Sequence, residues 1–132
     1  MTFGEAFSRA LGIFAGAGIG GVLRYAVGAW IHRRAKGPFP WGTFAVNVTG
    51  CFAMGALMSL AESGGGLPES ARTFLMTGIL GGFTTFSAYG GEAEHLLRMK
   101  EGRLFLAYAG GSVLAGLAAG AAGRLAVGWL SG

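Results

Sequence analysis

Long apolar stretches alternate with short polar segments along the whole chain. Four stretches stand out, at residues 10–31, 39–61, 72–97 and 104–130. A helix crosses the hydrocarbon core of a bilayer with about 20 mostly apolar residues, so each stretch predicts a transmembrane helix. The segments between them are too short to form a further domain. The pattern therefore predicts an all-α membrane protein, with one four-helix transmembrane domain over residues 1–132.

The third stretch contains an unusual segment, GILGGFTTFSAYGGE, at residues 78–92. Glycine loses more conformational entropy in a helix than alanine does, and threonine hydroxyls can replace lost backbone hydrogen bonds inside a membrane. Gly81 and Gly82, followed by Thr84 and Thr85, thus predict that the third helix is broken near the bilayer midplane. Such a break exposes carbonyl oxygens that suit a small cation and amide protons that suit an anion.

Composition and charge argue against several other classes of protein. Charged residues make up 12% of the chain, and 27 of its 132 residues are glycine, against about 25% charged and about 7% glycine in soluble domains. The ten basic residues lie mostly between the apolar stretches, as membrane flanks do, and form no basic patch interleaved with aromatic residues. We therefore expect the lipid bilayer, and no nucleic acid, as a partner. No cluster of nucleophile, base and orienting group occurs, so an enzyme is not expected.

Glycines recur at helical spacing in the first and last stretches. Gly12, Gly16 and Gly20 are four residues apart, and Gly116 with Gly120 repeats the interval. Small residues at this spacing let helix backbones approach closely in a membrane. The pattern favours close helix packing and an oligomer.

A few polar residues interrupt the apolar stretches, and each has two interpretations. Arg24 either extends to the lipid headgroups or attracts an anion from a vestibule. Asn47, on the same helical face as Thr43, either bonds a neighbouring helix or binds a ligand. Tyr108 and Ser112 share a face of the fourth stretch, where their hydroxyls bond either the backbone or a ligand.

Aromatic and titratable residues follow the predicted break. Phe86, Tyr89 and Glu92 form one row at three-residue spacing. The two rings are either packing residues or anion contacts, because an aromatic ring has a positive edge. His32 and His95 lie at the predicted membrane edges, far apart in sequence, and are interpreted as interfacial surface histidines.

Three segments together carry a resemblance to a known family. They are GAGIGGVLRY near the start, FPWGTFAVNVTG in the second stretch and GILGGFTTFSAYGGE in the third. The combination of WGTxxVN with GGxTTFS resembles the Fluc/CrcB family of fluoride channels, and the match covers essentially the whole chain in length, span count and motif order.

The resemblance implies an assembly, an ion and a set of residues. Members of this family are antiparallel homodimers, inserted in both orientations in the prokaryotic plasma membrane, which is the inner membrane in Gram-negative cells. Each dimer has two pores at its interface and a buried structural Na⁺, held by backbone carbonyls that correspond here to Gly81 and Thr84. The pore positions that match are Arg24, Asn47, Phe86, Tyr89, Glu92, Tyr108 and Ser112.

The implied activity is passive, fluoride-selective export. In this interpretation the Asn47 amide, the Phe86 ring edge and the hydroxyls of Thr43, Tyr108 and Ser112 replace the water around fluoride. Glu92 is expected to hydrogen-bond a neighbour, or to be protonated, instead of facing the anion as a free carboxylate.

Two features depart from the family pattern, and one alternative remains. The second aromatic position is usually phenylalanine, whereas Tyr89 stands here. Six basic residues on the loop side against three on the terminal side fit insertion in both orientations poorly. The alternative is a small dual-topology, proton-coupled multidrug or cation exporter, for which Glu92 is the candidate proton carrier.

Overall fold

The computed structural model describes residues 1–63 and 66–131, and every regular element within them is a helix. This confirms the predicted all-α class. The helices are α1 (Phe3–Arg34), α2 (Trp41–Glu62), α3 (Glu69–Arg72), η1 (Thr73–Leu80, a π-helix), α4 (Gly81–Phe83), α5 (Phe86–Arg98) and α6 (Gly102–Ser131). α1 begins seven residues before the first predicted stretch because a capping box between Thr2 and Glu5 starts it early.

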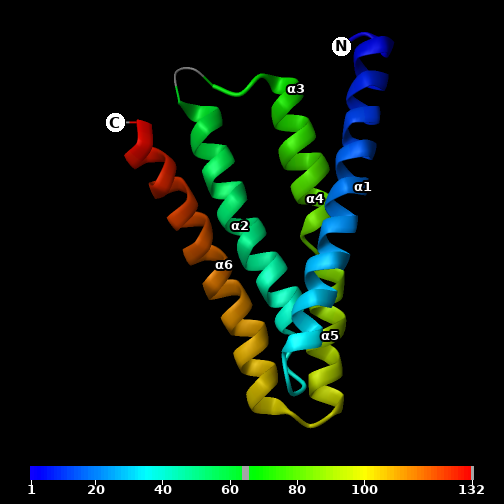
Figure 1. Cartoon of the computed structure of the whole chain (residues 1–132), viewed down its shortest axis with the longest axis vertical. Coiled ribbons are helices and arrows are strands. Elements are labelled where there is room, and N and C mark those ends of the chain that lie inside the picture. The colour runs from blue at the N-terminus through cyan, green and yellow to red at the C-terminus, as the bar shows by residue number, and fades with distance from the viewer. Residues whose placement is uncertain (64–65, 132) are drawn as a thin grey trace.

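The chain passes up and down along one long axis (Figure 1). Among the described residues, α1, α2 and α6 are the three helices long and apolar enough to cross a membrane. The segment from α3 through α5, residues 69–98, runs beside them in shorter helical pieces and is called the third pass below. Both termini lie at one end, the terminal end, and the α1–α2 and α5–α6 connections lie at the other, the loop end.

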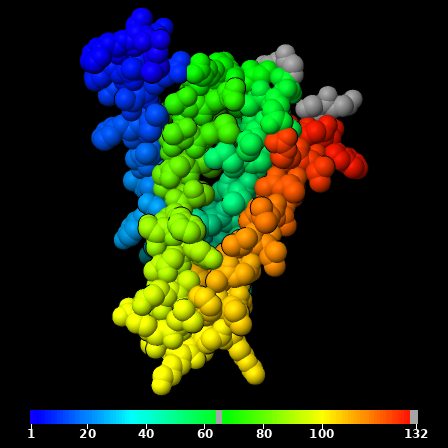
Figure 2. Space-filling view, turned by 180° about the vertical axis from the view of Figure 1, so that it is seen from behind, coloured from blue at the N-terminus to red at the C-terminus, as the bar shows by residue number. Residues whose placement is uncertain are grey.

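The helices pack mainly in two pairs, α2 with α6 and α1 with the third pass. Figure 2 shows the third pass running down the back face between α1 and α6, with part of α2 visible beside it. A Cβ on Gly20 would overlap the backbone of Ile79, and one on Gly55 would overlap the backbone of Gly120. The close helix approach predicted from the glycines is therefore present, and Gly20 makes it inside the chain.

The third pass differs from the prediction in where it breaks. Gly81 and Gly82 remain helical in α4, and the break falls on Thr84 and Thr85, whose φ/ψ values of −83°/159° and −150°/121° are extended. A Cβ on Gly82 would overlap the backbone of Ala17, so close contact with α1 explains this glycine. β-Branched threonine favours extended backbone, so the break falls on Thr84 and Thr85 and not on the two glycines before them.

Candidate functional site at the helix break

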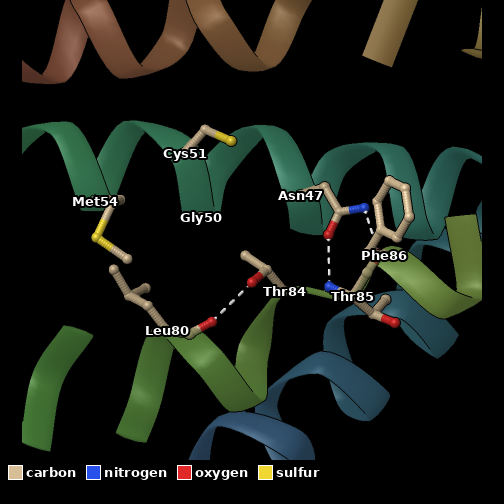
Figure 3. A pocket seen from close by; sticks show the side chains of 8 residues that line it. All are labelled: Asn47, Gly50, Cys51, Met54, Leu80, Thr84, Thr85 and Phe86. Carbon is tan, nitrogen blue, oxygen red and sulfur yellow. Dashed lines mark hydrogen bonds between the residues drawn. The ribbon is translucent and has the colours of Figure 1, made fainter. Parts of the chain in front are cut away.

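Asn47 of α2 completes the backbone hydrogen bonds that the break leaves open. Its Oδ1 accepts from the Thr85 backbone N–H at 2.8 Å, and its Nδ2 donates to the Thr85 carbonyl at 3.0 Å (Figure 3). Because the Thr85 N–H can only donate, this pair of bonds also fixes which end of the amide carries oxygen. One Nδ2 proton takes part in these bonds, so the amide has a second proton to offer.

The two threonines of the break have separate tasks. The Thr85 hydroxyl accepts from the Ala88 N–H at 3.2 Å and caps α5, while the Thr84 hydroxyl donates to the Leu80 carbonyl at 2.9 Å. The Thr85 hydroxyl thus replaces a missing backbone acceptor, as polar side chains must where no water is available. The Thr84 hydroxyl adds a second bond to the Leu80 carbonyl, which also accepts from the Thr84 N–H at 3.0 Å. Thr85 was not among the predicted site residues, although threonine is one of the residues preferred at the N-cap of a helix, here α5.

The backbone carbonyls before the break also have altered hydrogen bonds. In a continuous helix the Thr85 N–H would donate to Gly81, but here it donates to Asn47, so the Gly81 carbonyl is released from the ladder. The Thr84 carbonyl accepts from the Arg24 guanidinium at 3.3 Å. A carbonyl has two lone pairs, so this contact leaves Thr84 one for another partner. Uncharged oxygens of this kind fit the chemistry of a small hard cation.

A cavity of about 260 Å³ lies between α2 and the break (Figure 3). Its lining residues are Asn47, Gly50, Cys51, Met54, Leu80, Thr84, Thr85 and Phe86. The Phe86 side chain is 84% exposed in the single chain. Asn47 and Phe86, two predicted site residues, thus line the same cavity (Figure 3).

A second polar group surrounds Glu92 on α5. Thr43 of α2 donates to one carboxylate oxygen at 2.8 Å, and the completely buried Tyr108 of α6 donates to the other at 2.6 Å. The prediction that Glu92 hydrogen-bonds its neighbours is confirmed. Three helices meet at this carboxylate, and the hydroxyl protons of Thr43 and Tyr108 are committed to it.

The aromatic residues continue from the cavity toward α6. The ring centroids of Phe86 and Tyr89 are 5.6 Å apart, and those of Tyr89 and Tyr108 are 5.4 Å apart. The Tyr89 hydroxyl donates to the Ala109 carbonyl at 2.9 Å. This bond explains what the extra hydroxyl does at a position where phenylalanine was expected: it ties α5 to α6.

Ser112, one turn beyond Tyr108 on α6, differs from the other site hydroxyls. Its Oγ is buried and has no hydrogen-bond partner among the described residues. A buried hydroxyl without a partner is costly unless a ligand or water meets it. Thr43, Tyr108 and Glu92 thus form one cluster, Asn47 and Phe86 lie at the break, and the buried Ser112 hydroxyl has no partner among the described residues.

These features define a small helical membrane protein whose polar side chains gather around a broken helix. The chain belongs to the CrcB family: the family described as "CrcB-like protein, Camphor Resistance (CrcB)" matches residues 11–124.

Several relatives in this family have a printed function. The chain is 44% identical over 122 residues to "Fluoride-specific ion channel FluC 2" of Nocardia farcinica, which covers 92% of this chain and 86% of the relative. It is 51% identical over 108 residues to "Fluoride-specific ion channel FluC" of Novosphingobium aromaticivorans, covering 77% and 82%. The protein of that name from Rhizobium meliloti is 48% identical over 99 residues, covering 75% and 79%.

Proposed function

We propose that this protein is a passive, fluoride-selective ion channel that lowers cytoplasmic fluoride. The names of the relatives support fluoride as the transported ion. The observation that carries the proposal within the chain is the buried Ser112 hydroxyl, which has no partner among the described residues. This hydroxyl is a hydrogen-bond donor on an apolar helix, and a small anion that leaves water needs such donors.

The donors would act in sequence along the path of the ion. Fluoride is small and strongly hydrated, so a pore must replace its water with close donors that do not hold it too tightly. The second Nδ2 proton of Asn47, the Ser112 hydroxyl and the edge of the Phe86 ring fit this task. Thr43 and Tyr108 contribute indirectly, because their protons hold the Glu92 carboxylate and offset its repulsion of the anion.

The working unit in this proposal is an antiparallel homodimer with two pores. The 84% exposure of Phe86 in the single chain supports a second copy, because a large apolar side chain next to polar donors is expected to be covered in the assembly. A structural Na⁺ would lie where the Gly81 and Thr84 carbonyls of both copies meet. The release of the Gly81 carbonyl supports this placement.

Export needs no coupled energy source in this scheme. In the plasma membrane of a prokaryote, an inside-negative potential drives an anion outward by about 2.3 kcal/mol per charge for each 100 mV. A proton-coupled exporter would need Glu92 to exchange protons for substrate. Both of its oxygens accept hydrogen bonds from side chains, which favours a positioning role.

Fluoride efflux from liposomes tests the proposal. Purified protein is reconstituted, valinomycin is added to remove the potassium diffusion barrier, and fluoride and chloride are followed with selective electrodes. We expect rapid loss of fluoride and no loss of chloride. If folded protein releases no fluoride, the channel proposal is wrong and proton-coupled substrate exchange through Glu92 becomes the next function to measure.

A further inference from the structure

The fold brings two distant histidines to one opening at the loop end. A cavity of about 500 Å³ is lined by His32, Arg24 and Glu92 among others, and a second of about 300 Å³ is lined by His32, His95 and Glu92. The two cavities share His32, Pro40 and Glu92, so they adjoin. We call the two together the loop-end mouth. From the sequence, each histidine was expected to be a separate interfacial surface residue.

The charges that face this mouth come from two helices. α1 contributes Arg24, Tyr25 and His32, and α5 contributes Glu92 and His95. Glu92 accepts hydrogen bonds on both oxygens, from Thr43 of α2 and Tyr108 of α6. Several further charged residues lie nearby in sequence but do not line either cavity: Arg33, Arg34, Lys36, Glu94, Arg98, Lys100, Glu101 and Arg103.

With both histidines neutral, the charges that line the mouth nearly cancel. Arg24 carries one positive charge and Glu92 one negative charge. Imidazole is the side chain whose charge changes between about pH 5 and 8. Protonation of both imidazoles would add two positive charges to a mouth in which Glu92 is the acidic residue among those that line it.

We propose that the loop-end mouth is a binding site for small inorganic anions, and that protonation of His32 and His95 increases its occupancy. The inference rests on the proposed channel function and deepens it, because the mouth also contains Arg24 and Glu92 of the candidate site. A concave surface with a net positive charge concentrates anions. At low ionic strength we expect the fluoride current to rise about two- to fivefold between pH 7.5 and 5.5. The rise falls away as salt screens the mouth.

Fluoride current across a planar bilayer is the suitable measurement, because hydrogen fluoride crosses lipid without carrying charge. The wild-type protein is compared with two double variants, at low fluoride with both chambers at the same pH. His32→Gln with His95→Gln cannot gain charge, so its current should not rise on acidification. His32→Arg with His95→Arg is always charged, so its current near neutral pH should match the acidified wild type. Lys36→Gln, which removes a charge outside the mouth, should keep the wild-type ratio.

The outcomes separate the two proposals. A wild-type fluoride current that does not change with pH overturns the inference and leaves the channel function standing. A rise that persists in the double glutamine variant does the same, because the charge then comes from other groups. Absence of fluoride current at every pH contradicts the channel function itself, and the inference with it. A rise that also persists at saturating fluoride contradicts a role in capture, because occupancy no longer limits the current there.

Discussion

The two halves of α2 make different kinds of contact with the rest of the chain. Toward the terminal end, Gly55 faces the Gly120 backbone and a Cβ on Gly123 would overlap the Phe52 carbonyl, so bare backbones pack against each other. Toward the loop end, Asn47 reaches the broken third pass with two hydrogen bonds. Close packing also occurs in the loop-end half, where a Cβ on Gly42 would press on the Gly28 backbone, but there polar bonds are added to it. This loop-end half is called the polar half, because its side chains Thr43 and Asn47 bond to the third pass.

The ends of the bundle repeat this contrast. At the terminal end, Arg9 pairs with Glu69 and Arg124 pairs with Glu62, both at 2.6 Å and with every partner partly exposed. Exposed ion pairs of this type contribute little, about 0–1 kcal/mol. The loop end also has an exposed ion pair, Arg98 with Glu94 at 3.0 Å, and in addition His32 and His95 line a cavity there. The loop end is therefore the one to test for function.

The largest effect is expected from Asn47→Asp in the polar half. A carboxylate cannot donate to the Thr85 carbonyl and places a negative charge beside the anion path, so fluoride efflux should fall roughly 100-fold. Efflux from liposomes measures this change. Thr49→Val on the same helix is the control, because the Thr49 hydroxyl bonds its own helix backbone. Unchanged efflux in Asn47→Asp would show that the amide is not needed for conduction.

Gly55→Val tests the half of α2 nearer the termini. The new side chain would overlap the Gly120 backbone, so the free energy of unfolding should fall by about 1–3 kcal/mol. Thermal unfolding in detergent measures the loss, and fluoride selectivity of the protein that remains folded should not change. Gly128→Val, where a Cβ meets nothing within 4 Å, serves as the comparison. Equal stability of the two variants would refute close packing as the source of stability here.

Phe86→Ile asks whether an aromatic edge contributes to the polar half. Isoleucine keeps the apolar bulk but has no positive ring edge, so efflux should fall about tenfold. The control is Phe52→Ile, at an exposed phenylalanine in the half of α2 nearer the termini. This variant should leave efflux at the wild-type level. The rate of fluoride loss from liposomes distinguishes them, and equal rates would remove the ring from the list of ion contacts.

The smallest effect is expected from Tyr89→Phe. The ring stays and the 2.9 Å hydrogen bond to the Ala109 carbonyl is lost, which should lower the free energy of unfolding by about 1 kcal/mol. Fluoride selectivity over chloride should be retained, because the hydroxyl proton is given to the backbone and not to the ion. Tyr25→Phe, at a side chain 79% exposed, controls for loss of a hydroxyl alone. A loss of selectivity without a loss of stability would place the hydroxyl in the ion path.

Local chemistry explains what could be predicted at the break. Glycines and threonines in an apolar run predict a weak helix, since their backbone preferences act within a few residues. The break falls inside the predicted segment, at Thr84 and Thr85. Gly82 stays helical and fits against Ala17 of α1, a contact between segments far apart in sequence that the local pattern does not contain. The π-helix η1 before the break was not predicted for the same reason.

The sequence by itself determined the class of protein, the four apolar passes, the family and most candidate residues, because hydropathy and motif spacing are local properties. Only the tertiary structure decided the partners of those residues. It joined Asn47 to Thr85, gathered Thr43 and Tyr108 on Glu92, and left Ser112 without a partner among the described residues. It also placed His32 and His95 on one mouth. Hydrogen bonds and cavities depend on how helices pack in three dimensions, and spacing along one helix does not contain that information.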